Sequence, residues 1–330
     1  MTALRPDLGS AIEALHPGAR WSTLPGDAST RRFHRLFLES GGTRIVMDYG
    51  APFTGETDDV KLARIFERAE LPVARVLDVL PDAGAIVLED LGDVTLEEAL
   101  GRADEGRARS RRELYGSAVG LAARIATRGT DALGRSDRAG GPALDQERFL
   151  FEMRYFLEHY VGGLLRRHDA CAALEEPLFA LAVTVAKHPR VMCHRDYHSR
   201  NLMVTHHGSL AMVDIQDARW GPDTYDLASL LRDAYVDFSE EEVREHLEAY
   251  RVHLDAAADG EAFRRRFHEA GAQRMIKALG TFGYQISRLG RERYRSAIPR
   301  TVERLRRLLP GDRSTAPLGA LLEEVKALAG

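Results

Sequence analysis

The sequence predicts an α+β protein of two lobes, in which a small strand-rich lobe precedes a larger, mainly helical one. Short apolar runs between polar turns fill the first part of the chain, and helical spacing dominates after Gly92. A non-helical segment, 191–217, interrupts the helical part. A chain of 330 residues exceeds what one hydrophobic core usually fills, so two lobes are expected. We therefore divide the chain into residues 1–92 and 93–330.

The first lobe is expected to be an antiparallel meander that contains one helix. A polar segment at 25–31 and the pair Gly41-Gly42 supply turns between the apolar runs. Apolar residues recur at roughly helical spacing over 57–69, which predicts the helix. The expected strands cover 21–24, 33–39, 44–48, 71–80 and 85–88.

The second lobe is expected to be built mainly from helices. Thr95, with Glu97 and Glu98 after it, is typical of a helix start, because a hydroxyl caps the first N–H groups and acids favour the first turn. Polar, Gly-rich segments at 101–112 and 131–142 are expected to be surface loops. The expected helices cover 109–127, 145–160, 171–187, 239–255 and 261–287.

The composition predicts a folded cytoplasmic protein. With 44% hydrophobic and 29% charged residues the chain is not of the disordered class, and a net charge of −4 gives no electrostatic case for nucleic acid as a partner. Cys171 and Cys193 alone cannot form a disulfide framework. The N-terminal residues lack a signal-peptide pattern, and no apolar run approaches the roughly 20 residues that span a bilayer. We expect no membrane partner; the oligomeric state stays open.

The segment 191–217 carries the chemistry. Asn201 follows Asp196 at five residues, and two short apolar runs, 202–205 and 210–213, then lead to Asp214. This spacing is typical of the catalytic loop and metal-binding aspartate of kinases. Phosphoryl transfer needs a carboxylate to orient the attacking hydroxyl and oxygen ligands for Mg²⁺. Asp196 would be the catalytic carboxylate, and Asn201 and Asp214 would be the metal ligands.

Two further residues near this segment are expected to support it. His194 is expected to pack under the loop and not to carry protons. Asp226 is expected to open a helix and to brace the loop from beneath. The alternative for Asp226 is an ordinary acid at a helix N-terminus. A single His-x-Asp, or an Asp after a strand, occurs often by chance, so the interpretation depends on all these features occurring together.

These residues resemble those of the aminoglycoside phosphotransferase/choline kinase superfamily. The similar segments are 194–201 (HRDYHSRN), 213–218 (VDIQDA) and 221–227 (GPDTYDL). Segments 26–33, 45–48 and 273–280 look most like the bacterial sugar kinases that phosphorylate the anomeric hydroxyl of N-acetylmuramate and N-acetylglucosamine in cell-wall recycling. The resemblance covers roughly residues 10–310. It implies a bilobal protein-kinase-like fold, ATP and Mg²⁺ as cofactors, and a small-molecule sugar as acceptor.

The sequence departs from the usual kinase pattern on the third strand. A lysine normally binds the α- and β-phosphates there, whereas this strand has Met47 or Asp48 at that place. The resembled sugar kinases share the feature. Arg31 or Arg32 would supply the missing charge. Their neighbours Ser29 and Thr30 would add hydroxyl donors, although an ordinary solvent-facing hairpin turn explains the same residues.

The adenine and the acceptor would lie at opposite ends of the site. The connector 87–92, with Glu89 and Leu91, would offer backbone groups to the adenine, and interlobe packing is the alternative. His198 and Arg200 would steady the γ-phosphoryl or a sugar oxygen. The candidate acceptor-binding residues are Glu152, Tyr155 and His159 on one predicted helix, and Arg274 and Lys277 on another. A half-buried amphipathic helix and a solvated basic face explain these two groups equally well.

Three other functions stay open from the sequence. One is phosphorylation of an aminoglycoside or another small alcohol, but a polycationic acceptor needs an acidic site and Arg154, Arg274 and Lys277 disfavour it. A nucleotide-binding pseudokinase would explain the missing lysine but not the intact Asp196. A protein kinase is disfavoured because the sequence lacks the Asp-Phe-Gly and Ala-Pro-Glu pair.

Overall fold

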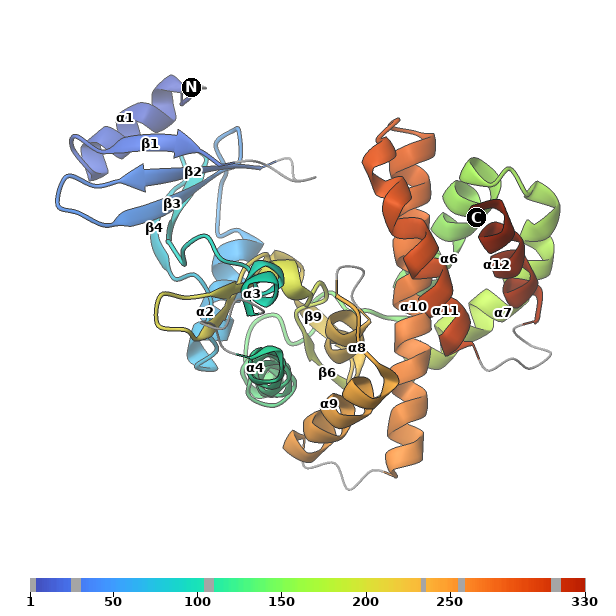
Figure 1. Ribbon diagram of the computed structural model, residues 1–330. Coiled ribbons are helices and arrows are strands. Elements are labelled where there is room, and N and C mark those ends of the chain that lie inside the picture. The colour runs from blue at the N-terminus through green and yellow to red at the C-terminus, as the bar shows by residue number, and fades with distance from the viewer. Residues whose placement is uncertain are drawn as a thin grey trace.

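The computed structural model describes residues 4–24, 31–103, 110–232, 236–254, 259–309 and 316–329. Figure 1 shows a small sheet-containing lobe on one side, the long helix α10 with its neighbours on the other, and the catalytic segment between them. None of the helices within these ranges is long and apolar enough to cross a membrane.

The first lobe is a five-stranded antiparallel sheet with the order β1-β2-β3-β5-β4. Helix α1 (Pro6–Leu15) packs its Leu8 and Ile12 against Leu36, Val46 and Val87 of the sheet. The strands are β1 (Arg20–Thr23), β2 (Arg32–Phe37), β3 (Thr43–Asp48), β4 (Val76–Leu80) and β5 (Ala85–Glu89).

Two expectations for this lobe need correction. Helix α1 was not expected, because ten residues with only two deeply buried apolar side chains give a weak helical pattern. The strand expected over 71–80 begins only at Val76, since Leu71 and Val73 pack into the core of the second lobe. Helix α2 (Asp58–Arg68) also buries its apolar face there, through Leu62, Ile65 and Phe66.

The second lobe is mainly helical, as expected. It contains α3 (Leu96–Ala103), α4 (Arg111–Arg124), α5 (Thr130–Gly134), α6 (Gln146–Phe156), α7 (His168–Ala186), α8 (Tyr225–Leu231), α9 (Glu240–His253), α10 (Gly260–Ser287), α11 (Ile298–Leu308) and α12 (Ala316–Ala329). π-Helical turns η1 (Ile125–Gly129) and η2 (Leu157–Leu164) extend α4 and α6, and a 3-10 turn, η5 (Glu292–Ala297), precedes α11.

Thr95 accepts a hydrogen bond from the Glu98 N–H, as a cap of α3 should. The loop expected over 131–142 is corrected in its first residues, which belong to α5, and α11 and α12 were not foreseen.

Two short antiparallel strand pairs hold the segment 191–217. Strand β6 (Arg190–Cys193) pairs with β9 (Arg219–Pro222), and β7 (Leu202–Val204) pairs with β8 (Leu210–Met212). The β7–β8 pair is the hairpin expected from the two apolar runs. Because β6 leads into the catalytic loop and β8 leads into Asp214, both ends of the candidate site are fixed by strand pairing.

Helix α10 is the long helix against which its neighbours in the second lobe pack (Figure 1). It approaches the end of α6 and η2 closely through two glycines. A Cβ on Gly283 would lie 2.5 Å from the His159 carbonyl oxygen, and one on Gly280 would lie 3.0 Å from Phe156 Cα. The close packing fixes the part of α10 that carries Arg274 and Lys277.

Candidate active site

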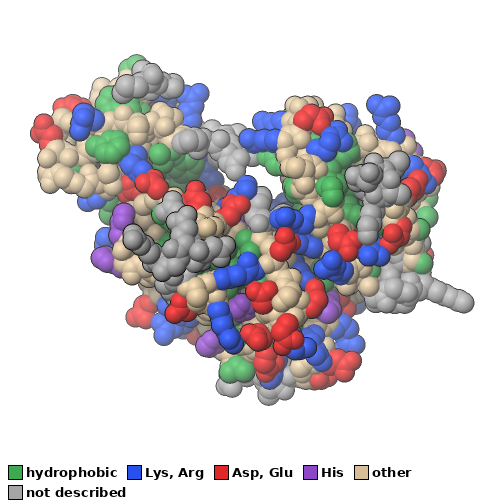
Figure 2. Space-filling view, viewed as in Figure 1, with side chains coloured by type: hydrophobic (Ala, Val, Ile, Leu, Met, Phe, Trp, Pro, Cys, Tyr) green, Lys and Arg blue, Asp and Glu red, His purple; other side chains and the backbone are tan. Residues whose placement is uncertain are grey.

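A cleft of about 1260 Å³ separates the two lobes. Residues of the sheet, of the catalytic segment and of the helical lobe all line it. Figure 2 shows a notch between the lobes, with Lys and Arg side chains gathered on its helical side. The volume exceeds that of a typical single-ligand pocket, roughly 300–1,000 Å³, so the cleft has room for two substrates side by side.

Asp196 lies in a backbone turn that is held under strain. Arg195, just before it, has φ 81°, a region that bulky residues rarely adopt. The buried carboxylate of Asp226 accepts hydrogen bonds from the N–H groups of His194 (2.6 Å) and Arg195 (2.9 Å). His194 Nε2 lies 2.9 Å from the Val213 carbonyl oxygen, which ties the loop to the end of β8. These contacts keep Asp196 in the cleft.

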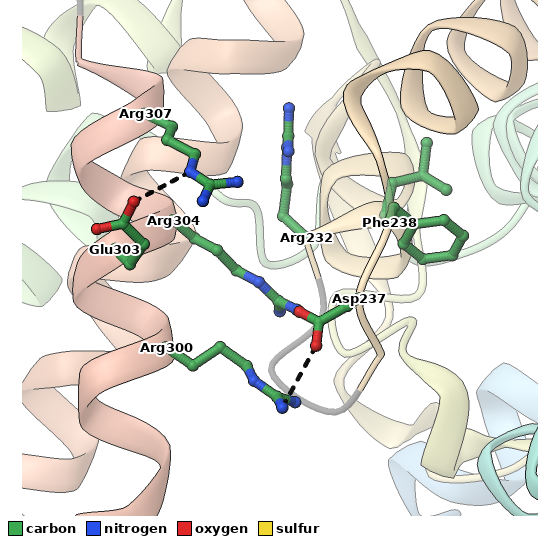
Figure 3. Close-up of a pocket in the computed structure, with 8 residues that line it drawn as sticks. Arg232, Asp237, Phe238, Arg300, Glu303, Arg304 and Arg307 are labelled. Atoms are coloured by element: carbon green, nitrogen blue, oxygen red, sulfur yellow. Dashed lines mark hydrogen bonds and ion pairs between the residues drawn. The ribbon is translucent and has the colours of Figure 1, made fainter.

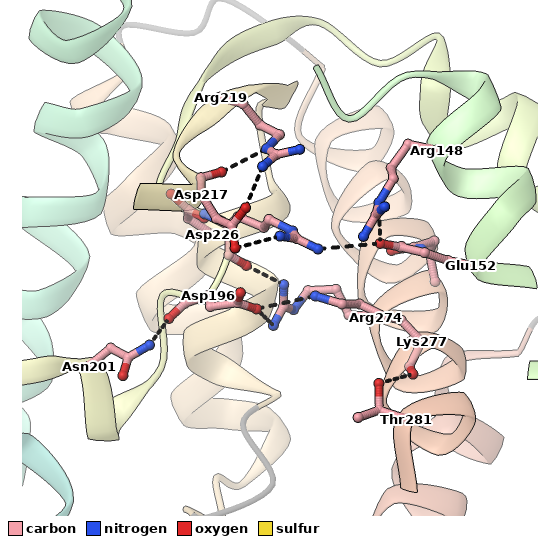
Figure 4. Close-up of polar contacts among 12 residues, drawn as sticks. Arg148, Glu152, Asp196, Asn201, Asp217, Arg219, Asp226, Arg274, Lys277 and Thr281 are labelled. Carbon is pink, nitrogen blue, oxygen red and sulfur yellow. Dashed lines mark hydrogen bonds and ion pairs between the residues drawn. The ribbon is translucent and has the colours of Figure 1, made fainter. Parts of the chain in front are cut away.

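Two cations of α10 surround the Asp196 carboxylate (Figure 4). Lys277 Nζ lies 3.2 Å and Arg274 Nη2 lies 3.8 Å from Asp196 Oδ1. Desolvation works to raise the pKa of Asp196, but Lys277 first, then Arg274 and Arg195, lower it well below its ordinary value. Burial lowers the pKa of Lys277, and the nearby Asp196 limits that fall. Asp196 is therefore held ionised, as a group that orients a hydroxyl must be.

Asn201 and Asp214 fit the requirements of a magnesium site. Asn201 Nδ2 donates to the Asp196 carbonyl (2.9 Å), so the amide oxygen is the branch left for a metal. Asp214 adopts the left-handed conformation (φ 62°) directly after β8, and its side chain is 48% exposed to the cleft. Both residues line the cleft and offer the oxygen ligands that Mg²⁺ prefers.

The wall of the cleft on the side of the sheet carries many apolar side chains and ends at the connector after β5. Glu89 and Leu91 both line it. The Glu89 side chain is ion-paired with Arg75, and the Glu89 N–H donates to the Arg75 carbonyl oxygen (2.9 Å), so both of these groups are engaged. Ser29 and Thr30 fall outside the described residues. The apolar lining residues include Phe33, Ile45, Ala74, Val76, Leu88, Met203 and Met212.

Arg31 and Arg32 take different positions. Arg31 lines the cleft and forms an ion pair with Asp59 of α2 (2.6 Å). Arg32 is exposed, at the strand position paired with Asp48. His198 and Arg200 both line the cleft beside Asp196. The Arg200 guanidinium is bound to Glu97 at the start of α3, through Nε (2.6 Å) and Nη2 (3.2 Å).

The structure does not bring Glu152, Tyr155 and His159 to the lining of the cleft. Glu152 is buried behind Asp196, where it accepts from Gln273 (2.7 Å) and lies 3.9 Å from Arg195 Nη2. Tyr155 and His159 belong to an aromatic cluster with Tyr284. Arg274 and Lys277 lie between this layer and Asp196, so they contact the candidate catalytic residue directly (Figure 4).

Residues of η5 and of the end of α10 form a further wall of the cleft, and the sequence did not single them out as site residues. The rings of Phe282 and Tyr294 stack with centroids 5.9 Å apart, and Arg293 Nη2 donates to the Tyr294 hydroxyl (3.3 Å). A tyrosine within the basic run 291–295 was the available signal. The lining residues here are Thr281, Phe282, Arg293, Tyr294, Ser296, Ala297 and Arg300.

A second, smaller hollow of about 100 Å³ lies beside α11 (Figure 3). Its arginines are bound by nearby acids: Asp237 pairs with Arg304 (2.6 Å) and Arg300 (3.3 Å), and Glu303 pairs with Arg307 (3.2 Å). The two pairs of Asp237 fasten α11 to the segment before α9, whereas the Glu303–Arg307 pair lies within α11. Among the described residues, Arg300 alone lines both this hollow and the cleft.

Residues 20–267 match the phosphotransferase enzyme family. The N-acetylmuramate/N-acetylglucosamine kinase of Neisseria meningitidis serogroup B is 32% identical over 308 residues, which cover 91% of this chain and 88% of the relative. A Pseudomonas aeruginosa protein of the same name is 31% identical over 332 residues, 96% of this chain and 94% of the relative.

Solved structures establish the fold. An ethanolamine kinase of Plasmodium vivax superposes with a TM-score of 0.63 at 14% identity, covering 93% of this chain and 87% of that one. The gentamicin complex of APH(2″)-IIa gives 0.61 at 14% identity, covering 92% and 97%. The bilobal kinase-like fold predicted from the sequence is confirmed. Since the family match spans more than half of the residues, this chain belongs to the phosphotransferase enzyme family.

Proposed function

We propose that this protein transfers the γ-phosphoryl group of ATP to the anomeric hydroxyl of an N-acetylated amino sugar, N-acetylmuramate or N-acetylglucosamine. The observation that carries the proposal is the placement of Asp196, Asn201 and Asp214 in one cleft with room for two substrates. The names of the relatives support the choice of sugar. A role in cell-wall sugar recycling and a cytoplasmic location belong to the same proposal, because ATP and free thiols fit a reducing compartment.

In this mechanism Asp196 orients the acceptor hydroxyl and accepts its proton as the bond from that oxygen to the γ-phosphorus forms and the bond from the γ-phosphorus to the β,γ-bridging oxygen breaks, so that ADP leaves. An anomeric hydroxyl is more acidic than an ordinary alcohol, so a carboxylate held fully ionised by Lys277 and Arg274 suffices as the base. Bound Mg²⁺, held by Asn201 and Asp214, would neutralise charge on the phosphates. The strained loop keeps the carboxylate oriented through Asp226.

The acceptor is proposed to lie against η5. The Tyr294 ring, with the buried Phe282 stacked on it, offers apolar surface to one face of a sugar, and Ser296 offers a hydroxyl. Arg293, at the same wall, suits the carboxylate of an acidic sugar.

We propose that residues 1–92 form the nucleotide-binding lobe and hinge, and that residues 93–330 form the lobe with the catalytic loop and acceptor site.

The test is Mg-ATP consumption with N-acetylmuramate, N-acetylglucosamine, glucose, an aminoglycoside and choline, with phosphorus NMR of the products. We expect a 1-phosphate from an N-acetyl sugar. Asp196→Asn should lower kcat at least 10²- to 10⁴-fold, the usual contribution of a general base. Lys187→Met, an exposed lysine away from the cleft, is the control. Turnover of the aminoglycoside or choline alone would reject the proposed acceptor, and ATP binding without any turnover would favour a regulatory module.

A further inference from the structure

The strand that usually carries the phosphate-binding lysine has no cation on its cleft face. On β3, Ile45 and Met47 line the cleft, and Met47 is 7% exposed. Asp48 is turned toward Arg5 (2.8 Å) and accepts from the Gly50 N–H (2.8 Å). The first lysine of the chain is Lys61, on α2. Another group must therefore meet the charge of the nucleotide phosphates.

The Arg31 guanidinium lies beside Met47, on the strand where other kinases carry the phosphate-binding lysine. Arg31 Nη1 lies 3.5 Å from Met47 Sδ and 2.6 Å from Asp59 Oδ1. Arg31 Nη2 lies 3.9 Å from Asp214 Oδ1. The cation is thus placed between strand three, helix α2 and the candidate metal-binding aspartate. In protein kinases, the strand-three lysine pairs with a carboxylate of the neighbouring helix and contacts the phosphates from the same region.

Strand alternation explains why Arg31 and not Arg32 reaches this place. Successive side chains of a strand point to opposite faces. Arg31, Phe33 and Arg35 line the cleft, whereas His34 and Leu36 are buried on the other face. By the same alternation, Arg32 belongs to the face of His34 and Leu36, and it is exposed at the end of the strand.

Asp59 and Tyr49 hold the guanidinium in position. Tyr49 Oη donates to Asp59 Oδ2 (2.6 Å), so both carboxylate oxygens of Asp59 are engaged. Burial, together with the hydrogen bond to Asp59, raises the pKa of Tyr49 to about 12, so the hydroxyl stays a donor. The Arg31 Cζ also lies 6.0 Å from the centre of the Tyr49 ring.

We propose that Arg31 has taken over the phosphate-binding role of the strand-three lysine, with Asp59 and Tyr49 as its positioning residues. The inference rests on the proposed function only in requiring that a nucleoside diphosphate or triphosphate binds in this cleft. An arginine suits a position that is not on strand three. Its longer side chain reaches across from the residue before β2, and its planar guanidinium can bind Asp59 and phosphate oxygens through separate nitrogens. Asp59 is one methylene shorter than the usual glutamate partner, which matches the bulkier cation.

Equilibrium binding of ADP and of adenosine to the full chain tests the inference without turnover. Arg31→Met should weaken ADP binding about 10- to 100-fold, the range for loss of a hydrogen bond to a charged group, and leave adenosine binding within about 2-fold. Arg20→Met, on the exposed end of β1, is the matched control and should change neither. Asp59→Asn should weaken ADP binding less than Arg31→Met, because the guanidinium stays but is no longer fixed.

A double variant separates a moved cation from a merely structural arginine. Arg31→Met with Met47→Lys returns a lysine to strand three, within reach of Asp59, and should recover at least about 3-fold of the lost ADP affinity. Unchanged ADP binding in Arg31→Met, or an equal loss of adenosine binding, would overturn the inference. A wild-type protein that binds no ADP would instead overturn the proposed function, so the two failures are distinguishable.

Discussion

Asp196 differs from an ordinary surface carboxylate because two cations of α10 stand within 4 Å of it. Lys277 and Arg274 lower its pKa, whereas its partial burial works in the opposite direction. An acid whose pKa is lowered stays ionised as the pH falls, so the base remains active in mildly acidic solution. The position of the acid limb of the activity profile therefore depends on α10.

We predict that Lys277→Met moves the acid limb of kcat/KM to higher pH. Removing the cation takes away the largest lowering influence while desolvation remains, so the pKa of Asp196 rises and the ionised fraction falls at acid pH. The loss of activity should thus be greater near pH 5 than near pH 8. Profiles of kcat/KM against pH for wild type, Lys277→Met and the exposed-lysine control Lys187→Met measure this. A uniform loss at every pH would mean that Lys277 acts on the acceptor and not on Asp196.

The sequence could predict the mutual placement only of those site residues that lie close together along the chain. Asp196, Asn201 and Asp214 fall within one segment, and their spacing is a consequence of the loop and hairpin that hold them. The Arg31–Asp59 pair joins residues 28 positions apart, and the contact of Lys277 with Asp196 spans 81. Such contacts depend on how elements pack, which spacing alone does not encode.

The strength of the helical pattern does not separate the elements that the sequence predicted from those that it missed, since α11 buries Ile298, Val302 and Leu305 along one face and was still not foreseen. Strands β1, β2, β3 and β5 and the long helices α7, α9 and α10 appear where the sequence placed them, within a few residues, whereas β4 begins only at Val76. Helix α1 and turn η5 were missed because each is short, and η5 buries none of its residues. The proposed acceptor wall was therefore missed with η5, and Glu152, Tyr155 and His159 were named as candidates instead.

The close packing of α10 on η2 leads us to a stability prediction for Gly283, and Gly116 of α4 serves as the comparison. Gly283→Ala should lower the free energy of unfolding by about 3 kcal/mol, because its Cβ would meet the backbone of His159 at 2.5 Å and neither helix can easily move. Gly116→Ala, in the exposed interior of α4 with nothing within 4 Å of its Cβ, should raise it by about 0.5–1 kcal/mol.

Urea unfolding followed by circular dichroism measures both variants. The pair is matched in chemistry and differs only in the space around the new methyl group. Equal effects of the two substitutions on the free energy of unfolding would contradict the close approach of α10 to η2. Because α10 carries Arg274 and Lys277, Gly283→Ala should also lower kcat, whereas Gly116→Ala should not.

At the scale of the whole molecule, the sheet is the less stably anchored part. Its hydrophobic cluster, built from α1 and the strands, is the smallest of the three found in the described residues. Helix α2 belongs instead to the large cluster around α4 and the catalytic segment. The sheet can therefore open while α2 stays folded, and the Arg31–Asp59 ion pair crosses the boundary between the two units.

Native-state hydrogen exchange should show this difference and its dependence on nucleotide. In the free protein, β2, β3 and β5 should exchange through openings of lower free energy than those that expose α2 and α10. ADP in 100-fold excess over its Kd should slow exchange in the strands about 100-fold, equal to about 2.7 kcal/mol, since opening of the sheet destroys the cleft. Helix α12, which does not line the cleft, serves as the internal control. If α2 instead exchanged together with the strands, the first lobe would open as one unit and the ion pair would be internal to it.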